Sequence, residues 1–380
     1  MDSKVLVLGC GEMGEMAIED LVVYGNFDEV MIATRHPEKA KPLMNKLRGR
    51  RTRLSVQQLE LTDQEKLVAL MKEAEVVLNS AGPNYKNALP VARAAIKAKV
   101  NLVDMCDDYE VTSELLALDN QAKAAGITIV IGLGASPGIN NVIARLGANA
   151  LDEVEEIHTA WIMSGADPGG LALSYHLLYS LSGKALTFQD GKYVEVQSFR
   201  DGREVLEFPK PLGKMEVFHI GHPEPITLPR YFKGLKYADD KASFAPPIVN
   251  DWIVNLRALG LCSGEPVDIN GTAITPMDMA AKFFHKTCKG MKDYPKDGGL
   301  RVEVKGKWRG KTTRLIYSAT GRIAAGTGIA AAIGAQMLAD RMVEETGVFA
   351  PEGCIDPGIF MQELLDKRSI GALETKRIEE

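Results

Sequence analysis

The chain has 380 residues, of which 46% are apolar and 25% are charged, and its formal net charge at pH 7 is −5. This length predicts two domains rather than one. The negative charge excludes a basic surface for nucleic acid or for an anionic membrane, and no apolar run reaches the roughly 20 residues that span a bilayer. The five cysteines are scattered without a C-x-x-C pair, which argues against a disulfide framework or a zinc site. With no signal-peptide pattern at the N-terminus, we expect a cytoplasmic protein.

The first part of the chain alternates short apolar runs with helical patterns. The predicted strands are residues 5–8, 30–33, 54–59, 76–79, 100–104 and 127–131. The predicted helices are residues 13–24, 37–47, 63–71, 87–98 and 111–125. This alternation predicts an α/β fold with right-handed crossovers and a doubly wound parallel sheet of the Rossmann type. In such a sheet the carboxyl ends of the strands form one rim, where ligands bind.

Three glycines between the first strand and the first helix form the clearest motif. Gly9, Gly11 and Gly14 match G-x-G-x-x-G in a strand–turn–helix context, which predicts dinucleotide binding. Gly9 allows the tight turn, Gly11 lets a pyrophosphate approach the backbone, and Gly14 lets the helix pack on the strand. Glu12 and Met13, inside the same turn, are expected to contact the cofactor as well.

The end of the second strand discriminates between the two nicotinamide dinucleotides. An NAD site usually carries a carboxylate there, which accepts from the ribose 2′-hydroxyl. This strand instead ends in Thr34 and Arg35, and its acidic residues stand at its start. A guanidinium can pair bidentately with a 2′-phosphate, so we expect NADP(H) rather than NAD(H). The alternative is that Arg35 lies in a solvated turn before Pro37.

Two further strand ends carry small residues that suit a nicotinamide ribose. Asn79, Ala81 and Gly82 follow the fourth strand, and Ser136 and Gly138 follow the sixth. We predict that these five residues contact the cofactor, although ordinary turn chemistry accounts for either loop equally well.

The fifth strand ends in a group of carboxylates. Asp104, Asp107 and Tyr109 are the candidate catalytic residues, because neighbouring carboxylates raise one another's pKa and one of them can then accept a proton near neutral pH. The competing interpretation is that Asp107 or Asp108 caps the helix that starts near Val111.

After residue 149 the pattern changes to that of a mixed α/β domain. Residues 155–163 and 193–199 are predicted strands, and residues 300–307 with 312–320 form a predicted hairpin. The expected organisation is a dinucleotide-binding domain, a mixed α/β domain, and C-terminal helices that pack back on the first domain, with bounds 1–149, 150–320 and 321–380. The charged residues 374–380 are expected to fray.

A proline-rich loop in this second part supplies candidate substrate-binding residues. Arg230 could hold a substrate carboxylate bidentately, and His222 lies in the same loop. His176, between Tyr175 and Leu177, could line a pocket. The histidines lack H-x-x-x-H spacing, so no metal is expected. A surface loop with incidental histidines is the alternative.

The ordered motifs resemble the saccharopine dehydrogenase-like oxidoreductases over nearly the whole chain. They are the N-terminal glycine turn, Asn79-Ser-Ala-Gly-Pro, Asp104, Ala122-x-x-Ala-Gly126 and Gly134-x-x-Pro-Gly138. The C-terminal Gly347-Val-Phe-Ala-Pro-Glu, Asp356-Pro and Phe360-x-x-Glu-Leu resemble the lysine 6-dehydrogenase branch. The resemblance implies that residues 150–320 form an α/β substrate-binding and dimerisation domain. It also implies a homodimer that transfers hydride between a nicotinamide and an amine or imine carbon of an amino acid. It also implies that Arg230 binds the substrate carboxylate.

Two positions depart from the family pattern. Family members often carry Gly-Gly-Leu/Ile-Pro early in the substrate domain, whereas here Gly169-Gly170-Leu171 lacks the proline. The lysine 6-dehydrogenase branch tends to an acidic residue after the second strand. Thr34 and Arg35 are more similar to the NADP-using saccharopine reductases.

The sequence therefore predicts an NADP(H)-dependent oxidoreductase that acts on the CH–NH bond of an amino acid or an amino-acid conjugate. One alternative is a C=C or C=O reductase for a lipid-like or polyketide substrate, with a pocket lined by Leu177, Leu178 and Phe188. A second alternative is a non-catalytic NADP-binding sensor. No nucleic acid or membrane partner is expected.

Overall fold

The computed structural model describes residues 3–181 and 183–380, which divide into two compact units. The first unit is formed by the chain up to Arg145 together with Ala324–Ser369, and the second by Leu146–Ile323 together with Ile370–Glu380. Each unit therefore combines segments that are distant in the sequence. In the described part of the chain, no helix is both long and apolar enough to cross a membrane.

The first unit is built on a seven-stranded parallel sheet with the order β17-β6-β5-β4-β1-β2-β3. Its strands are β1 (Lys4–Leu8), β2 (Glu29–Thr34), β3 (Arg53–Gln58), β4 (Val76–Asn79), β5 (Asn101–Asp104), β6 (Thr128–Val130) and β17 (Gly347–Phe349). The apolar run of β1 is completely buried from Val5 to Leu8, as expected for a central parallel strand that is covered on both faces. The predicted Rossmann-type α/β fold is confirmed.

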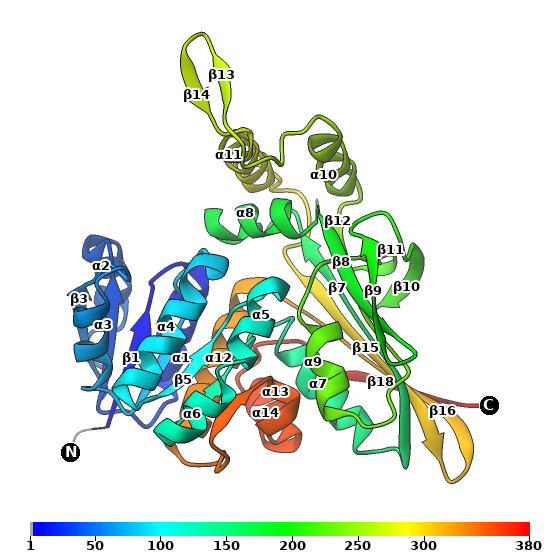
Figure 1. Cartoon of the computed structure of the whole chain (residues 1–380), viewed down its shortest axis with the longest axis horizontal. Helices are drawn as coiled ribbons and strands as arrows, with labels where there is room; N and C mark the ends of the chain where they lie inside the picture. Colours follow the sequence, from blue (N-terminus) through cyan, green and yellow to red (C-terminus); the bar gives the residue numbers. More distant parts are fainter. Residues whose placement is uncertain (1–2, 182) are drawn as a thin grey trace. The chain divides into compact units, whose positions relative to one another are not determined.

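Helices connect these strands and surround the sheet (Figure 1). They are α1 (Glu12–Val23), α2 (Pro37–Lys46), α3 (Gln64–Met71), α4 (Asn84–Ala98), α5 (Tyr109–Leu116), α6 (Asp119–Ala125), α7 (Ile139–Ala148), α12 (Ile323–Ala339), α13 (Pro351–Cys354) and α14 (Pro357–Asp366). The Ala-rich α12 approaches α1 closely, because a Cβ on Gly328 would lie 2.4 Å from the carbonyl oxygen of Met13.

Two details of the first unit differ from the sequence prediction. The single helix predicted over residues 111–125 is two helices, α5 and α6. The start of α6 is held by Asp119, whose carboxylate accepts a hydrogen bond from the backbone N–H of Val348 at 3.0 Å. The three-residue β17, which pairs with β6, was not among the predicted strands. A strand this short shows no alternating pattern that would reveal it.

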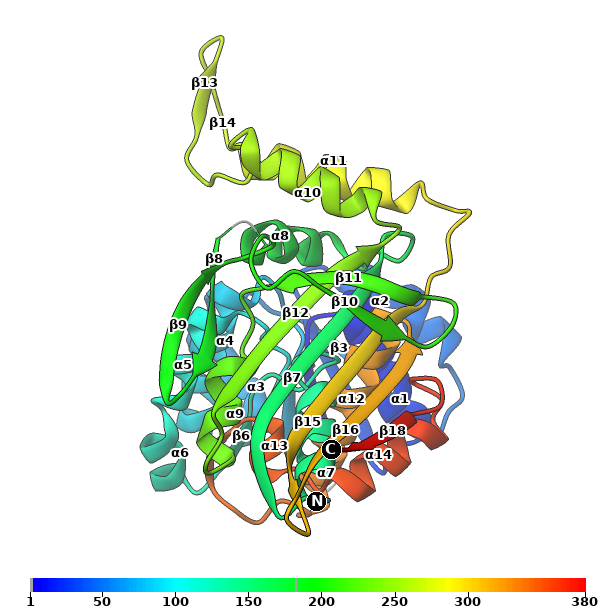
Figure 2. The same ribbon diagram turned by 90° about the vertical axis from the view of Figure 1, so that its right-hand side faces the viewer.

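The second unit contains a nine-stranded mixed sheet, seen face-on in Figure 2. Its path is β10-β11-β12-β7-β15-β16-β18, and β8 pairs with both β12 and β9. The strands are β7 (Glu153–Ser164), β8 (Lys184–Gln189), β9 (Lys192–Gln197), β10 (Glu204–Phe208), β11 (Gly213–His219), β12 (Tyr237–Ala245), β15 (Gly298–Trp308), β16 (Lys311–Gly321) and β18 (Glu374–Glu379). The predicted hairpin of β15 and β16 is present.

One face of this sheet packs on helices to form the core of the second unit. The helices are α8 (Leu171–Ser180), α9 (Glu224–Tyr231), α10 (Ile248–Ala258) and α11 (Pro276–Lys289). Trp161 and Met163 of β7 and Phe244 of β12 are buried in this core. The small hairpin of β13 (Val267–Ile269) and β14 (Thr272–Ile274) projects beyond α10 and α11 (Figure 2).

The C-terminal residues do not fray as expected. β18 pairs with β16 in antiparallel register from Thr313↔Glu379 to Ser318↔Glu374. The prediction was wrong because a charged segment can still form an edge strand. On such a strand alternate residues face solvent, so the charged side chains of residues 374–380 do not prevent pairing.

Candidate active site

The glycine turn after β1 has the backbone geometry that the dinucleotide motif requires. Gly9 has a φ of +94°, which favours glycine, and its N–H donates to the carbonyl of Ala33 at 2.9 Å. A Cβ on Gly14 would lie 2.6 Å from Ser80 Oγ, so this glycine permits a close approach. Gly11 is the N-cap of α1 and has no side-chain capping bond, and a Cβ there would meet nothing within 4 Å. Open space in front of a helix N-terminus suits an anionic pyrophosphate.

The remaining residues of this turn and of the second strand end are accessible. Glu12 is exposed and Met13 is half-buried at the start of α1. Thr34 is half-buried and Arg35 is exposed at the end of β2. Glu29 lies at the opposite end of β2, where it is paired with Arg53 at 2.5 Å. No carboxylate therefore occupies the end of β2, which is compatible with a 2′-phosphate.

Asn79 is a buried residue that fixes the loop after β4. Its Nδ2 donates to Asp104 Oδ2 at 2.7 Å, and its Oδ1 accepts from the N–H of Ala81 at 3.2 Å. The carbonyl of Ala81 in turn accepts from Asn87 Nδ2 at 2.9 Å. The loop that includes Gly82 is thus tied to both β5 and α4, and a bound ribose would meet a preformed surface.

Asp104 is buried rather than open to a substrate. Both of its oxygens accept hydrogen bonds, one from Asn79 and the other from the N–H of Cys106 at 2.7 Å. Burial raises the pKa of Asp104 to about 6, and the charges of Asp107 and Asp108 add to this effect. The geometry therefore suits a residue that positions Asn79 better than one that contacts the substrate.

Asp107 and Tyr109 are the accessible members of the group predicted after β5. Both are half-buried, and Asp107 accepts from Asn84 Nδ2 at 2.9 Å. Asp108 occupies the N-cap position of α5, but its side chain makes no capping hydrogen bond. The capping interpretation is therefore not supported for the Asp108 side chain, and the catalytic role of Asp107 stays a prediction.

The loop between β6 and α7 is held by residues that sequence analysis did not single out. Gly138 has a φ of +125°, and a Cβ there would lie 2.0 Å from the carbonyl oxygen of Gly134. Asn141 Oδ1 accepts from the N–H of Gly138 at 2.9 Å, and Asn140 Nδ2 donates to Ser136 Oγ at 3.0 Å. Ser136 is half-buried. Ile139 alone separates Asn140 and Asn141 from the Gly-Ala-Ser-Pro-Gly motif, and this proximity was the available signal in the sequence.

These loops come together within the first unit. Ser80 Oγ donates to the carbonyl of Leu8 at 2.9 Å, which joins the β4 loop to the glycine turn. The N–H of Leu133 donates to the carbonyl of Asp104 at 3.0 Å, which joins the β6 loop to β5. The ends of β1, β4, β5 and β6 therefore form one rim, as the parallel sheet predicted.

In the second unit, His222 is buried against two carboxylates. Its Nδ1 lies 3.0 Å from Glu224 Oε2 and 3.2 Å from Asp240 Oδ2. The rings of Trp161 and His176 flank it, with centroid distances of 5.6 and 6.0 Å. The structure thus brings together His176 and His222, the two histidines predicted to bind substrate.

Arg230 lies apart from this cluster. It is exposed in the last turn of α9, whereas Glu224 is fully buried in the first turn. Six residues of α-helix correspond to about 9 Å along the axis. The structure does not bring Arg230 to His222. A cation near a helix C-terminus interacts favourably with the helix dipole, so the position of Arg230 can be explained without a ligand.

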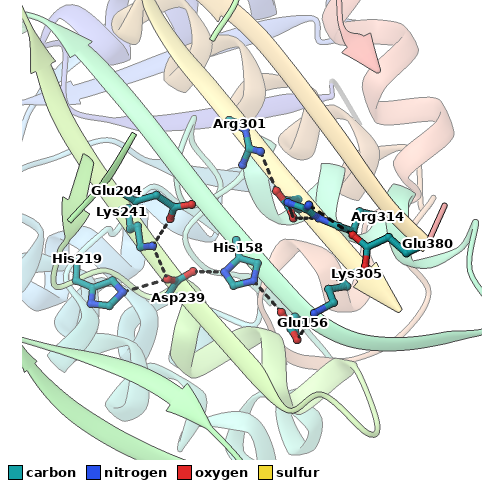
Figure 3. A network of polar contacts seen from close by, with 11 residues as sticks. Glu156, His158, Glu204, His219, Asp239, Lys241, Arg301, Lys305, Arg314 and Glu380 are labelled. Atoms are coloured by element: carbon teal, nitrogen blue, oxygen red, sulfur yellow. Dashed lines mark hydrogen bonds and ion pairs between the residues drawn. The ribbon is translucent and has the colours of Figure 1, made fainter. Parts of the chain in front are cut away.

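A network of charged side chains covers part of the opposite face of the second sheet (Figure 3). Asp239 Oδ1 lies 2.8 Å from His158 Nδ1, and Asp239 Oδ2 lies 3.0 Å from His219 Nε2. Lys241 bridges Asp239 and Glu204, at 3.4 and 2.6 Å. The network lines a polar cavity of about 230 Å³. Asp239 and Lys241 share β12, but their partners come from β7, β10 and β11, so no local motif marks the network in the sequence.

Two family models together match most of the chain. The saccharopine dehydrogenase NADP binding domain matches residues 5–130, and the saccharopine dehydrogenase C-terminal domain matches residues 134–370.

Individual relatives agree with these matches. Carboxynorspermidine synthase of Vibrio cholerae is 26% identical over 303 residues, which are 73% of this chain and 71% of that protein. Carboxynorspermidine synthase of Vibrio alginolyticus is 24% identical over 301 residues, with 72% and 70% covered. The apo structure of saccharopine dehydrogenase (L-Glu forming) from Saccharomyces cerevisiae has the same fold, with a TM-score of 0.70 at 16% identity over 99% of this chain and 100% of that chain.

The predicted family and the prediction of an enzyme are therefore confirmed. The rim of the first unit and the two family matches lead to the same conclusion: the chain belongs to the saccharopine dehydrogenase family of nicotinamide-dependent oxidoreductases.

Proposed function

We propose that this protein is an NADP(H)-dependent oxidoreductase that transfers a hydride to or from the CH–NH carbon of an amino acid or of an amino-acid or polyamine conjugate. The observation that carries the proposal is the preformed rim of the first unit, with an open helix N-terminus at Gly11 and an accessible carboxylate at Asp107. The names of the relatives support it, because saccharopine and carboxynorspermidine are both secondary amines that carry carboxylates.

The residues of the first unit would hold the cofactor in three places. Gly9, Gly11 and Gly14, with Glu12 and Met13, would surround the pyrophosphate. Thr34 and Arg35 would bind the 2′-phosphate. The residues framing the nicotinamide ribose would be Asn79, Ala81, Gly82, Ser136 and Gly138. The bound nicotinamide supplies the hydride chemistry, so the protein contributes orientation and electrostatics.

The proton on the substrate nitrogen needs a separate acceptor. When the C–H bond of the amine gives up its hydride, the nitrogen loses a proton and a C=N bond forms. Asp107 is the proposed acceptor, with Tyr109 beside it on α5, and Asp104 positions Asn79. In the reductive direction Asp107 returns the proton to the nitrogen, as microscopic reversibility requires.

The cofactor preference can be tested by binding alone. Arg35→Ala is expected to weaken NADPH at least tenfold while NADH affinity changes by less than about twofold, because only NADPH carries the 2′-phosphate. Arg93→Ala, an exposed arginine on α4, is the control. Titration of the nucleotide fluorescence gives both constants. Tighter binding of NADH than NADPH by the unaltered protein would refute the NADP assignment.

The reaction can be tested with the compounds that the relatives' names suggest. Saccharopine and carboxynorspermidine, together with lysine from the resemblance to the lysine 6-dehydrogenase branch, are offered with NADP⁺, and NADPH formation is followed by absorbance. Asp107→Asn is expected to lower kcat by about 10²–10⁴-fold if it is the proton acceptor. Glu110→Gln, an exposed change on the same helix, is expected to leave kcat unchanged. Tight NADPH binding without turnover of any amine or imine would favour the sensor alternative.

The lipid-like alternative has little structural support. Leu177 and Leu178, which it requires in a pocket lining, are 1% and 0% exposed and belong to the core under α8. Phe188 packs edge-on against Tyr193 of the neighbouring strand, with ring centroids 5.6 Å apart. Turnover of an enone panel in place of amines would reverse this preference.

We also retain a homodimer and a cytoplasmic location as proposals. The family resemblance supports the dimer, and five cysteines scattered in the sequence without the spacing of a disulfide framework support a reducing compartment. Light scattering coupled to gel filtration measures the mass directly, and a monomer across the micromolar range would exclude the dimer.

Arg230 also remains a proposed carboxylate ligand. An unchanged KM for carboxylated substrates in Arg230→Ala would exclude this role.

A further inference from the structure

The feature that the proposed function leaves unused is the pair of carboxylates beneath His222. Glu224 is 0% exposed, Asp240 is 1% exposed and His222 is 2% exposed. Burying two carboxylates beside each other is costly unless a positive charge and hydrogen bonds compensate them. The buried pair therefore lowers the stability of the fold unless the neighbouring histidine carries the compensating positive charge.

Side chains of β7 hold Asp240 in a fixed orientation. Its Oδ1 accepts from Thr159 Oγ1 at 2.6 Å, and its Oδ2 accepts from Trp161 Nε1 at 3.1 Å. The register of the sheet places Asp240 directly beside Thr159, since β12 pairs with β7 in parallel. Glu224 reaches the same point from the first turn of α9. The carboxylates therefore meet Nδ1 of His222 from two rigid elements.

The electrostatics of this cluster favour one proton arrangement. Burial and the charge of Glu224 raise the pKa of Asp240 to about 7, so the two acids resist being ionised together. The charge and hydrogen bonds of Glu224 and Asp240 outweigh the burial of His222 and hold its pKa well above the usual value. His176 of α8 is the other titratable group that faces this ring within the second unit.

The imidazole ring has a direction as well as a charge. Its Nδ1 is turned toward the two carboxylates, so its Nε2 lies on the other side of the ring and is directed away from them. A protonated Nε2–H is a donor that can form a charge-assisted hydrogen bond to an anion. The imidazolium of His222 would thus be a buried cation for the substrate carboxylate. Arg230 is exposed in the last turn of α9 and does not provide a cation at this point.

We propose that Glu224 and Asp240 are positioning residues that keep His222 as an imidazolium, and that the Nε2–H of His222 binds a carboxylate of the substrate. The inference rests on the proposed function for the identity of the ligand. It assigns carboxylate selection to His222 and gives a role to two acidic residues that no sequence motif marked.

The protonation half of the proposal is tested without cofactor or turnover. The chain has six histidines, so ¹³Cε1-histidine NMR spectra are simple, and His222→Gln assigns the signal. In the unaltered protein the His222 signal is expected not to titrate between about pH 6 and pH 8. In Glu224→Gln and Asp240→Asn its pKa is expected to fall by at least one unit, whereas Glu216→Gln, a change at a half-exposed position on β11, leaves it in place. A His222 that titrates near 6.5 in the unaltered protein would overturn the proposal.

The ligand half is tested with carboxynorspermidine and norspermidine, which differ by one carboxylate. The unaltered protein is expected to bind the carboxylated compound at least tenfold more tightly, and His222→Gln is expected to abolish this preference. Asp240→Asn is expected to lose the preference at about pH 8 and to recover it below about pH 6, where an ordinary imidazole is protonated. A merely structural role would give no such recovery.

The two proposals fail in different ways. If the amine panel gives no turnover while His222 keeps its proton and the carboxylate preference, the reaction is wrong and the binding site stands. If turnover is normal but norspermidine binds as well as carboxynorspermidine, or Asp240→Asn shows no recovery at low pH, His222 is not the carboxylate ligand and the present inference is wrong.

Discussion

The two units place their polar residues in opposite ways. In the first unit the strands are buried and apolar, and Asn79 and Asp104 stand at strand ends. In the second unit charged residues stand in the middle of strands, and the register puts opposite charges side by side, as in His158↔Asp239 and Lys305↔Glu156. Opposite charges across neighbouring strands stabilise a sheet. Charge pairs between strands therefore contribute to the stability of the second sheet, whereas the strands of the first sheet are stabilised by apolar burial.

The largest effect is expected where the second unit relies most on charge. Asp239→Ala removes the partner of His158, His219 and Lys241 in the network of Figure 3. Leaving those groups uncompensated is expected to cost about 3–5 kcal/mol of unfolding free energy. Urea unfolding measures the change. Glu204→Gln alters the half-exposed partner of Lys241 and is expected to cost less than about 1 kcal/mol, and equal losses from both variants would show that the network does not depend on Asp239.

The same network predicts a loss of stability at alkaline pH. Burial alone would lower the pKa of His158, but the hydrogen bond and charge of Asp239 outweigh it and raise this pKa to about 9. The folded state therefore binds more protons than the unfolded state between about pH 6.5 and pH 9, so stability falls as the pH rises through that range. The expected decline is about 3 kcal/mol, and His158→Gln should remove it. An unchanged pH profile in that variant would contradict the assignment.

In the first unit the corresponding pH effect is expected at acidic pH. Burial raises the pKa of Asp104 to about 6, so folding takes up a proton between about pH 4 and pH 6. This carboxylate's contribution to stability is therefore greatest at the acidic end, declines by about 3 kcal/mol as the pH rises, and is constant above about pH 7. The stability difference between the unaltered protein and Asp104→Asn should follow that curve. A difference that does not vary with pH would mean that Asp104 keeps its ordinary pKa.

This contrast also explains what the sequence could predict. The first unit's rim was predictable because parallel strands bring their carboxyl ends together, so each loop could be interpreted locally. His158 and Asp239 are 81 residues apart and meet only through the register of β7 and β12. Residues 237–245, which form β12, contain two Asp, one Lys and no β-branched residue, so their composition did not indicate a strand. Their partners could not be named without the sheet order.

The sequence did not predict the short strand β17 or the edge strand β18 for a related reason. β17 has three residues and pairs with β6, more than 200 positions earlier, and β18 is a charged edge strand on β16. Arg230 was assigned from its place in a motif, but the start and end of α9 decide its exposure. Local patterns report burial on one face of an element, whereas these features depend on what lies beside the element.

The smallest effect on the fold, and the sharpest contrast with Asp239, is expected from Gly11→Ala. A Cβ there meets nothing within 4 Å and the φ is −89°, so the unfolding free energy is expected to change by less than about 1 kcal/mol. The added methyl group would occupy the space in which a pyrophosphate approaches the backbone, so NADPH affinity is expected to fall at least tenfold. Gly264→Ala, which also has open space, controls for the generic cost of losing a glycine. Unchanged NADPH affinity would mean that the open space before α1 is not the pyrophosphate site. Destabilisation without loss of affinity would show that the turn is needed for folding alone.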